Sequence, residues 1–187
     1  RITSSMSGGN FARKSKNYRI LWRWLLVTNL EFVEKVKQIA SEDTAFAFGA
    51  YGEIVNDGLF VRTVRNQSER YHDKSNLTRL LDCYGKKAYE CTALFTEPLR
   101  IARNEGIPNP NNLYKLWSTR KWLIEDMPDI PGLGVYLYGH VGVYIGNGQV
   151  IESTYSGGNF GVAATLLHDK PWTAAFAIKG VDYEGGF

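Results

Sequence analysis

The first clear pattern along the chain is an apolar stripe with helical spacing, formed by Phe32, Val33, Val36 and Ile39. Charged residues fill the positions between them, and a helix-capping residue, Thr28 or Asn29, stands just before the stripe. This combination is typical of an amphipathic helix on the surface of a core. We therefore expect a helix that begins at one of these two residues and ends near Ser41.

Less regular segments follow. Ala45–Gly52 is aromatic and ends in glycine, so we expect it to pass from a turn into the irregular wall of a site. Residues 53–82 are polar, with sparse hydrophobes, and are expected to form short helices and loops. Ala88–Asn104 has one apolar side and predicts a further helix, which Pro98 should kink or shorten because proline removes a hydrogen-bond donor. A third helical piece is expected over Asn112–Trp117.

Beyond residue 133 the hydrophobic period changes to two, which indicates strands. Four strands are expected, over Gly134–Tyr138, His140–Ile145, Gln149–Thr154 and Trp172–Ile178. Glycine-rich turns separate them. Helices first and an antiparallel sheet afterwards predict an α+β fold.

Length and composition fit one domain. The chain has 187 residues, of which 44% are hydrophobic and 22% charged, as in ordinary globular domains. Residues 29–187 are expected to form this domain, and residues 1–28, rich in Ser, Gly, Asn and Lys at the start, to be a partly disordered linker or remnant. The two tryptophans within residues 17–28 are expected to pack against the domain, with membrane or partner contact as the alternative.

Charge and hydropathy exclude several classes of protein. A net charge of +3 is too small to indicate nucleic-acid binding, although it suits a weakly anionic polymer such as a cell wall. The longest apolar run, Ile20–Val27, is interrupted by Arg23 and falls well short of the roughly 18 residues of a membrane span. No small-residue cleavage site follows it, so no signal peptide is expected.

Two cysteines and three histidines limit the chemistry. They are too few for a disulfide scaffold or a four-thiolate zinc site, and no metal or cofactor is expected. They do permit thiol chemistry, with two times three, or six, candidate cysteine–histidine pairs. His72 and His168 lie in polar or charged segments and are expected at the surface, which leaves His140.

Cys91 lies near the start of its predicted helix. Unpaired N–H groups and the positive end of the helix dipole would lower the pKa of a thiol there, and could also stabilise an oxyanion. The alternative is a buried cysteine that acts only as a small hydrophobe. Cys83 precedes a polar turn and is expected to be structural or idle, although it is close enough in sequence for a disulfide with Cys91.

The hairpin around His140 has a register that can be worked out. A three-residue loop, Gly146–Gly148, places Ile145 opposite Gln149 and makes Glu152 the diagonal neighbour of His140, about 7–8 Å away between backbones. A carboxylate there can accept the imidazole N–H and fix its tautomer. A two-residue loop would instead turn Glu152 to the opposite face. A hydrogen-bonded structural histidine is the alternative role for His140.

The segment GHVGVYIGNGQVIE (residues 139–152), preceded by Pro131–Tyr136, resembles the HVGIYIGNGKVI strand that follows a PGDLVFF-like strand in the NlpC/p60 family of cell-wall cysteine peptidases. Tyr89–Leu94 (YECTAL) is similar to the YDCSGL nucleophile motif of that family. Ala45–Gly52 is similar to its YVWGG segment. The resemblance is strong over residues 131–152 and looser over the rest of residues 29–180.

This resemblance implies a papain-like α+β fold and hydrolysis of amide bonds in peptidoglycan stem peptides. Cys91 would be the nucleophile, His140 its base, and Glu152 the third, polar member of the site. Phe46 stands where the family usually has a tyrosine, so that hydroxyl is either missing or supplied by Tyr51.

We accordingly expect a peptidoglycan hydrolase, a cysteine endopeptidase of the phage or mobile-element lysin type. Its partner would be the stem peptide, its place the cell wall or the extracellular space, and its state a monomer. A cysteine-dependent amidase of the CHAP type, which cuts between the glycan and the first alanine, is one alternative. A non-catalytic module for wall binding or assembly is the other.

Overall fold

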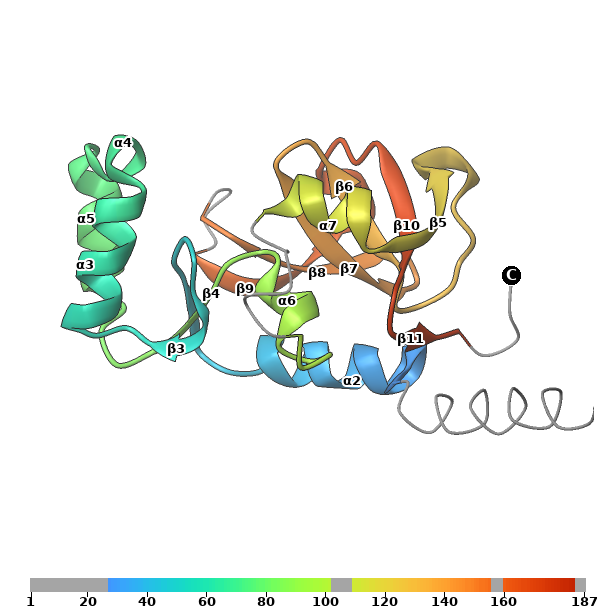
Figure 1. Cartoon of the computed structure of the whole chain (residues 1–187), viewed down its shortest axis with the longest axis horizontal. Helices are drawn as coiled ribbons and strands as arrows, with labels where there is room; N and C mark the ends of the chain where they lie inside the picture. The colour runs from blue at the N-terminus through green and yellow to red at the C-terminus, as the bar shows by residue number, and fades with distance from the viewer. Residues whose placement is uncertain (1–26, 102–108, 156–159, 184–187) are drawn as a thin grey trace, which may run out of the picture.

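A six-stranded antiparallel sheet holds most of the core in the computed structural model, which describes residues 27–101, 109–155 and 160–183 (Figure 1). The strand order is β5-β10-β6-β7-β8-β9. The strands are β5 (Ser118–Leu123), β6 (Gly134–Leu137), β7 (His140–Gly146), β8 (Gln149–Thr154), β9 (Gly161–Leu166) and β10 (Ala174–Ile178). The α+β class expected from the sequence is confirmed.

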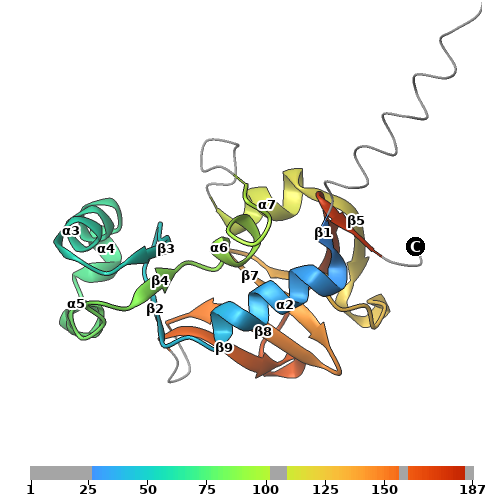
Figure 2. The same ribbon diagram turned by 90° about the horizontal axis from the view of Figure 1, so that it is seen from below.

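Helix α2 (Asn29–Ala40) lies across one face of this sheet, against β7, β8 and β9 (Figure 2). Thr28 is its N-cap and forms a capping box with Glu31, which satisfies backbone donors at the helix start. The predicted stripe faces inward, and the ring centroids of Phe32 and Phe95 are 5.9 Å apart. The predicted helix and its start are confirmed.

A second sheet of three short strands lies beside the first. Strand β4 (Lys87–Tyr89) is central, parallel to β2 (Thr44–Phe46) and antiparallel to β3 (Tyr51–Ile54). The helix predicted over Ala88–Asn104 is therefore wrong at its start, because Ala88 pairs with strands on both sides. Only α6 (Ala93–Thr96) is an α-helix within the described part of that segment, and residues 102–108 lie outside the described residues.

Three helices form a projection that stands apart from the main sheet (Figure 1). They are α3 (Asp57–Asn66), α4 (Ser68–Tyr71) and α5 (Lys74–Leu81). The projection and the small sheet share a separate apolar cluster that includes Leu59, Tyr71, Leu80 and Cys83. Short helices over residues 53–82 are thus confirmed.

The remaining elements complete the fold. Helix α7 (Pro110–Leu116) occupies the place of the third predicted helix, and single-turn 3-10 helices cover Ile124–Asp126 and Leu167–Asp169. Strands β5 and β9 are at the two edges of the main sheet and were not expected, because half-exposed edge strands carry little apolar signal.

Strands β1 (Val27–Thr28) and β11 (Val181–Asp182) pair in parallel, which places the first and last described segments side by side. The linker expected over residues 1–28 and the packing of its tryptophans otherwise fall outside the described residues. Within the described ranges, no helix combines the length and apolar character that crossing a membrane requires.

Candidate active site

The β7–β8 hairpin places His140 and Glu152 on neighbouring strands. Val143 pairs with Ile151 in the observed register. The turn itself holds two residues, Asn147 and Gly148, both with positive φ, and Gly146 rather than Ile145 pairs with Gln149. The expected Ile145–Gln149 pair is therefore wrong. A bulge between Tyr144 and Gly146 adds the residue that the shorter turn omits, so Glu152 keeps its place beside His140.

Glu152 is a fully buried carboxylate that contacts His140 directly. His140 Nε2 lies 2.5 Å from Glu152 Oε2, and Thr165 donates its hydroxyl to Oε1 at 2.8 Å. Lys170 Nζ lies 3.4 Å from Oε2. Burial acts to raise the pKa of Glu152, but the hydrogen bond and charge of His140, together with Thr165 and Lys170, outweigh it and lower that pKa. Glu152 is thus an ionised, multiply bonded group behind the imidazole.

The His140 ring is also fixed from the side. Trp172 stacks on it with ring centroids 5.5 Å apart and an interplanar angle of 16°. Because Nε2 faces Glu152, the nitrogen left for any other partner is Nδ1. The imidazole is only slightly exposed, at 17% of its surface, so the two contacts set its orientation.

Cys91 lies between β4 and α6 and lines the same cleft as His140. The cleft holds about 400 Å³ and lies between the sheet and the helical projection, with Phe46 and Phe48 as one wall. This agrees with the wall expected from Ala45–Gly52. Within the described part of the chain, no hydrogen bond joins the Cys91 thiol to His140, so the two groups share a cleft without being bonded.

Cys91 is 7% exposed, and its thiol differs from the expected low-pKa nucleophile. Burial raises its pKa to about 12, and the charge of Glu90 adds to this; hydrogen bonding to the backbone of Val141, Thr92 and Cys91 itself acts in the opposite direction. The expected lowering is wrong because α6 is a single turn and desolvation dominates. At neutral pH the thiol is protonated.

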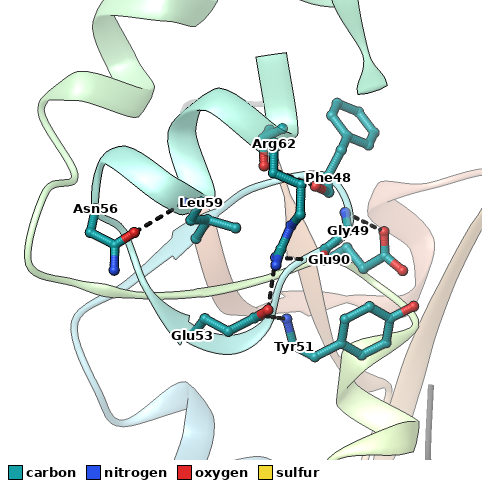
Figure 3. Close-up of polar contacts among 9 residues, drawn as sticks. Phe48, Gly49, Tyr51, Glu53, Asn56, Leu59, Arg62 and Glu90 are labelled. Atoms are coloured by element: carbon teal, nitrogen blue, oxygen red, sulfur yellow. Dashed lines mark hydrogen bonds and ion pairs between the residues drawn. The ribbon is translucent and has the colours of Figure 1, made fainter. Parts of the chain in front are cut away.

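Glu90 fastens the loop that carries Cys91 to the aromatic wall of the cleft. Its carboxylate accepts the Gly49 N–H at 2.8 Å and the Thr92 hydroxyl at 2.5 Å. Figure 3 shows the other side of this turn, where Arg62 donates to the Gly49 carbonyl at 3.2 Å and pairs with Glu53 at 2.7 Å. The turn that positions Phe48 is therefore held from two directions.

Two residues of the cleft were not singled out from the sequence. Tyr155, the residue after β8, has its ring centroid 5.1 Å from that of Phe46, and its hydroxyl accepts from Arg70 at 3.0 Å. Among the described residues that line the cleft, Tyr155 and not Tyr51 supplies a phenol. Arg70 and Tyr155 are 85 residues apart in the sequence, so no local pattern could have linked them.

The remaining candidates lie elsewhere. Cys83 is buried in the cluster of the projection, and both cysteines are free thiols, so the disulfide that the sequence left open is not formed. His72 and His168 are exposed, as expected. The described ranges contain no group of three His, Cys, Asp or Glu side chains placed to bind a metal ion.

Comparison with known proteins gave matches among solved structures. The chain matches no protein-family model and no curated protein. NlpC2 and NlpC1 from Trichomonas vaginalis align over 82% and 80% of this chain, with 17% and 18% identity and TM-scores of 0.48 and 0.46. The alignments cover 46% and 42% of those chains, so this chain spans less than half of each.

A third match is the P60 domain of antigen MAP1204 from M. avium subspecies paratuberculosis. It aligns over 83% of this chain and 98% of its own, with 16% identity and a TM-score of 0.47. The chain is thus similar to solved NlpC and P60 structures, at low sequence identity.

Proposed function

We propose that this chain is a thiol hydrolase that cleaves amide bonds in peptidoglycan stem peptides, with Cys91 as nucleophile and His140 as base. The observation that carries the proposal is the convergence of Cys91 and His140 on one cleft, with a buried, ionised Glu152 bonded to the far side of the imidazole. The YECTAL and GHVGVYIGNG segments support the choice of substrate through their resemblance to the cell-wall peptidases. The cell wall is the corresponding place of action.

The reaction divides into two halves. In the first, Nδ1 of His140 takes the proton of Cys91 as sulfur attacks the amide carbonyl carbon, and the C–N bond then breaks as His140 returns that proton to the leaving amine. In the second half, His140 takes a proton from a water molecule while the water oxygen attacks the thioester carbon. The C–S bond then breaks, and His140 passes the proton to the sulfur. Glu152 holds the imidazole by its Nε2–H and stabilises the imidazolium of both halves.

The raised pKa of Cys91 determines when the proton moves. Because burial keeps the thiol neutral in the free protein, its proton moves to His140 only after substrate has entered the cleft. A substrate that fills the cleft brings the carbonyl to the sulfur and makes that transfer productive.

A test compares Cys91→Ala with Cys83→Ser on purified cell walls. Cys91→Ala should release no soluble muropeptides, while Cys83→Ser, whose side chain lies in the other cluster, should keep most of the release. Continued release by Cys91→Ala contradicts the nucleophile assignment. Mass spectrometry then identifies the bond, because new N-terminal alanine indicates the CHAP-type amidase and cleavage after D-γ-glutamate indicates the endopeptidase.

The burial of Cys91 favours a second candidate, a wall-binding module without catalysis. A cysteine that is 7% exposed, with a thiol protonated at neutral pH, is also what a purely structural role requires. Under this alternative, the wild-type protein sediments with purified walls but releases no fragments. Release by the wild type that disappears in Cys91→Ala excludes it.

A further inference from the structure

The cleft beside Cys91 has an unbalanced positive charge. Among the described residues that line it are two permanent cations, Arg70 and Lys170, and no carboxylate. Lys170 lies 3.4 Å from the buried Glu152, so its charge is already matched. Arg70 forms no ion pair within the described ranges of the chain. An unmatched guanidinium at the edge of a cleft attracts an anionic group of a ligand.

Arg70 is held in a defined place although it is exposed. Its guanidinium carbon lies 4.4 Å from the centre of the Phe48 ring, and Nη1 donates to the Tyr155 hydroxyl at 3.0 Å. Its main-chain carbonyl accepts from the Asn76 side chain at 2.9 Å, which ties α4 to α5. Stacking on the ring leaves the in-plane N–H groups that do not contact Tyr155 available, and a planar guanidinium edge with several N–H donors matches a carboxylate.

We propose that Arg70 binds a carboxylate of the peptide whose amide bond faces Cys91, so that the cleft selects acidic peptides over their amidated forms. Phe48 and Tyr155 line the same cleft as Cys91 and His140 and hold the guanidinium of Arg70 at it. Stem peptides carry free carboxylates on D-glutamate and at the C-terminus, and the test below distinguishes the two. The inference rests on the proposed function for the identity of the peptide, but not for the charge preference itself.

The test measures binding separately from catalysis. Isothermal titration of Cys91→Ser with the synthetic tetrapeptide L-Ala-D-γ-Glu-L-Lys-D-Ala is compared with titration of two analogues, one amidated at the glutamate α-carboxyl and one at the C-terminus. We expect about tenfold weaker binding of one analogue, which identifies the carboxylate. Arg70→Gln should weaken binding of the free acid about tenfold and leave binding of the weaker amidated analogue nearly unchanged. Arg70→Lys should lose less affinity for the free acid.

Arg65→Gln is the matched control, because Arg65 is an exposed arginine at the end of α3. Added to Cys91→Ser, it should leave the affinity for all three peptides as it is in Cys91→Ser alone. Thermal unfolding of each variant checks that α4 remains folded. Three results would overturn the inference. They are equal affinity for the acid and both amides, an equal loss of affinity for all three peptides in Arg70→Gln, and no binding of any of the three.

The outcomes separate this inference from the proposed function. If the wild type cleaves the tetrapeptide and Arg70→Gln cleaves the acid and the amides with unchanged KM, the hydrolase stands and the carboxylate site fails. If binding depends on Arg70 and on the carboxylate but the wild type cleaves nothing, the site stands and the hydrolase fails.

Discussion

His140 and Glu152 face each other from adjacent strands of one hairpin, with Nε2 2.5 Å from Oε2 of a carboxylate that has no exposed surface. Lys170 and Thr165 complete the surroundings of that carboxylate. A buried charge is tolerated only when it is paired and hydrogen-bonded, so these contacts depend on one another. Removing any one group affects both the position of the imidazole and the stability of the sheet.

Glu152→Gln tests this dependence. Glutamine keeps the volume but not the charge that orients the imidazole and matches Lys170. We expect kcat/KM on cell-wall substrate to fall at least about 100-fold, or about 2.7 kcal/mol. The free energy of unfolding should fall by about 3–5 kcal/mol. Glu34→Gln, at an exposed carboxylate on α2, is the control and should change neither quantity appreciably. Activity within threefold of wild type would show that Glu152 does not position His140.

The stability of the protein should depend on Glu152 in acid. The pKa of this carboxyl is lowered from its ordinary 4.5, so its contribution is fully present above pH 4.5 and is lost as the pH falls through the lowered value. Urea unfolding at pH values from 7 to 3 should show a decline below about pH 4.5. Glu152→Gln should flatten part of that decline, and an unchanged slope in the variant would argue against an ionised Glu152.

Both thiols should react slowly in the folded protein. Burial raises the pKa of Cys91 to about 12 and also raises that of Cys83. We expect alkylation by iodoacetamide at pH 7.5 to be at least about 100-fold slower than for a free cysteine, because only the thiolate reacts. Peptide mapping by mass spectrometry assigns the alkylation to each cysteine separately, and both should stay unreactive until the pH is well above neutral. Rapid alkylation of Cys91 at pH 7.5 would contradict the raised pKa.

Gly142 should not tolerate a side chain. A Cβ added there would lie 2.5 Å from Cγ1 of Val150 and 3.4 Å from Cβ of Glu152. Gly142→Ala should therefore destabilise the protein by about 1–3 kcal/mol and reduce activity by shifting the hairpin. Val150→Ala removes the clashing methyl group, so the double variant should be more stable than the sum of the two single effects. Simple additivity in urea unfolding would show that the clash is relieved elsewhere.

The parts of the fold with strong local signals were predictable from the sequence. The stripe after Thr28 and its capping box define α2, and alternating residues after 133 define four strands of the main sheet. The placement of Glu152 beside His140 was also predictable, although the loop length assumed for the hairpin was wrong. A two-residue turn and a bulge together give the same placement as the expected three-residue loop, and a bulge leaves no clear mark in a single sequence.

The parts that failed depend on contacts between distant segments. Residues 88–89 begin a segment whose apolar pattern predicts a helix, yet pairing with β2 and β3 makes them a strand. Tertiary contacts therefore override local preference here. The pKa of Cys91 depends on its burial in the assembled core, which sequence position alone does not reveal. Arg70 and Tyr155 reach the cleft from the projection and from β8, and only the assembled fold brings them together.

Glu90 links two properties of the cleft that would otherwise be independent. Its carboxylate fastens the turn that carries Phe48, and its charge helps to raise the pKa of Cys91. Neutralising position 90 would make the thiol more acidic, but it would also loosen the platform on which Arg70 rests. Glu90 therefore couples the acidity of the Cys91 thiol, which burial mainly determines, to the rigidity of the cleft, and changing one alone requires compensation elsewhere in the turn.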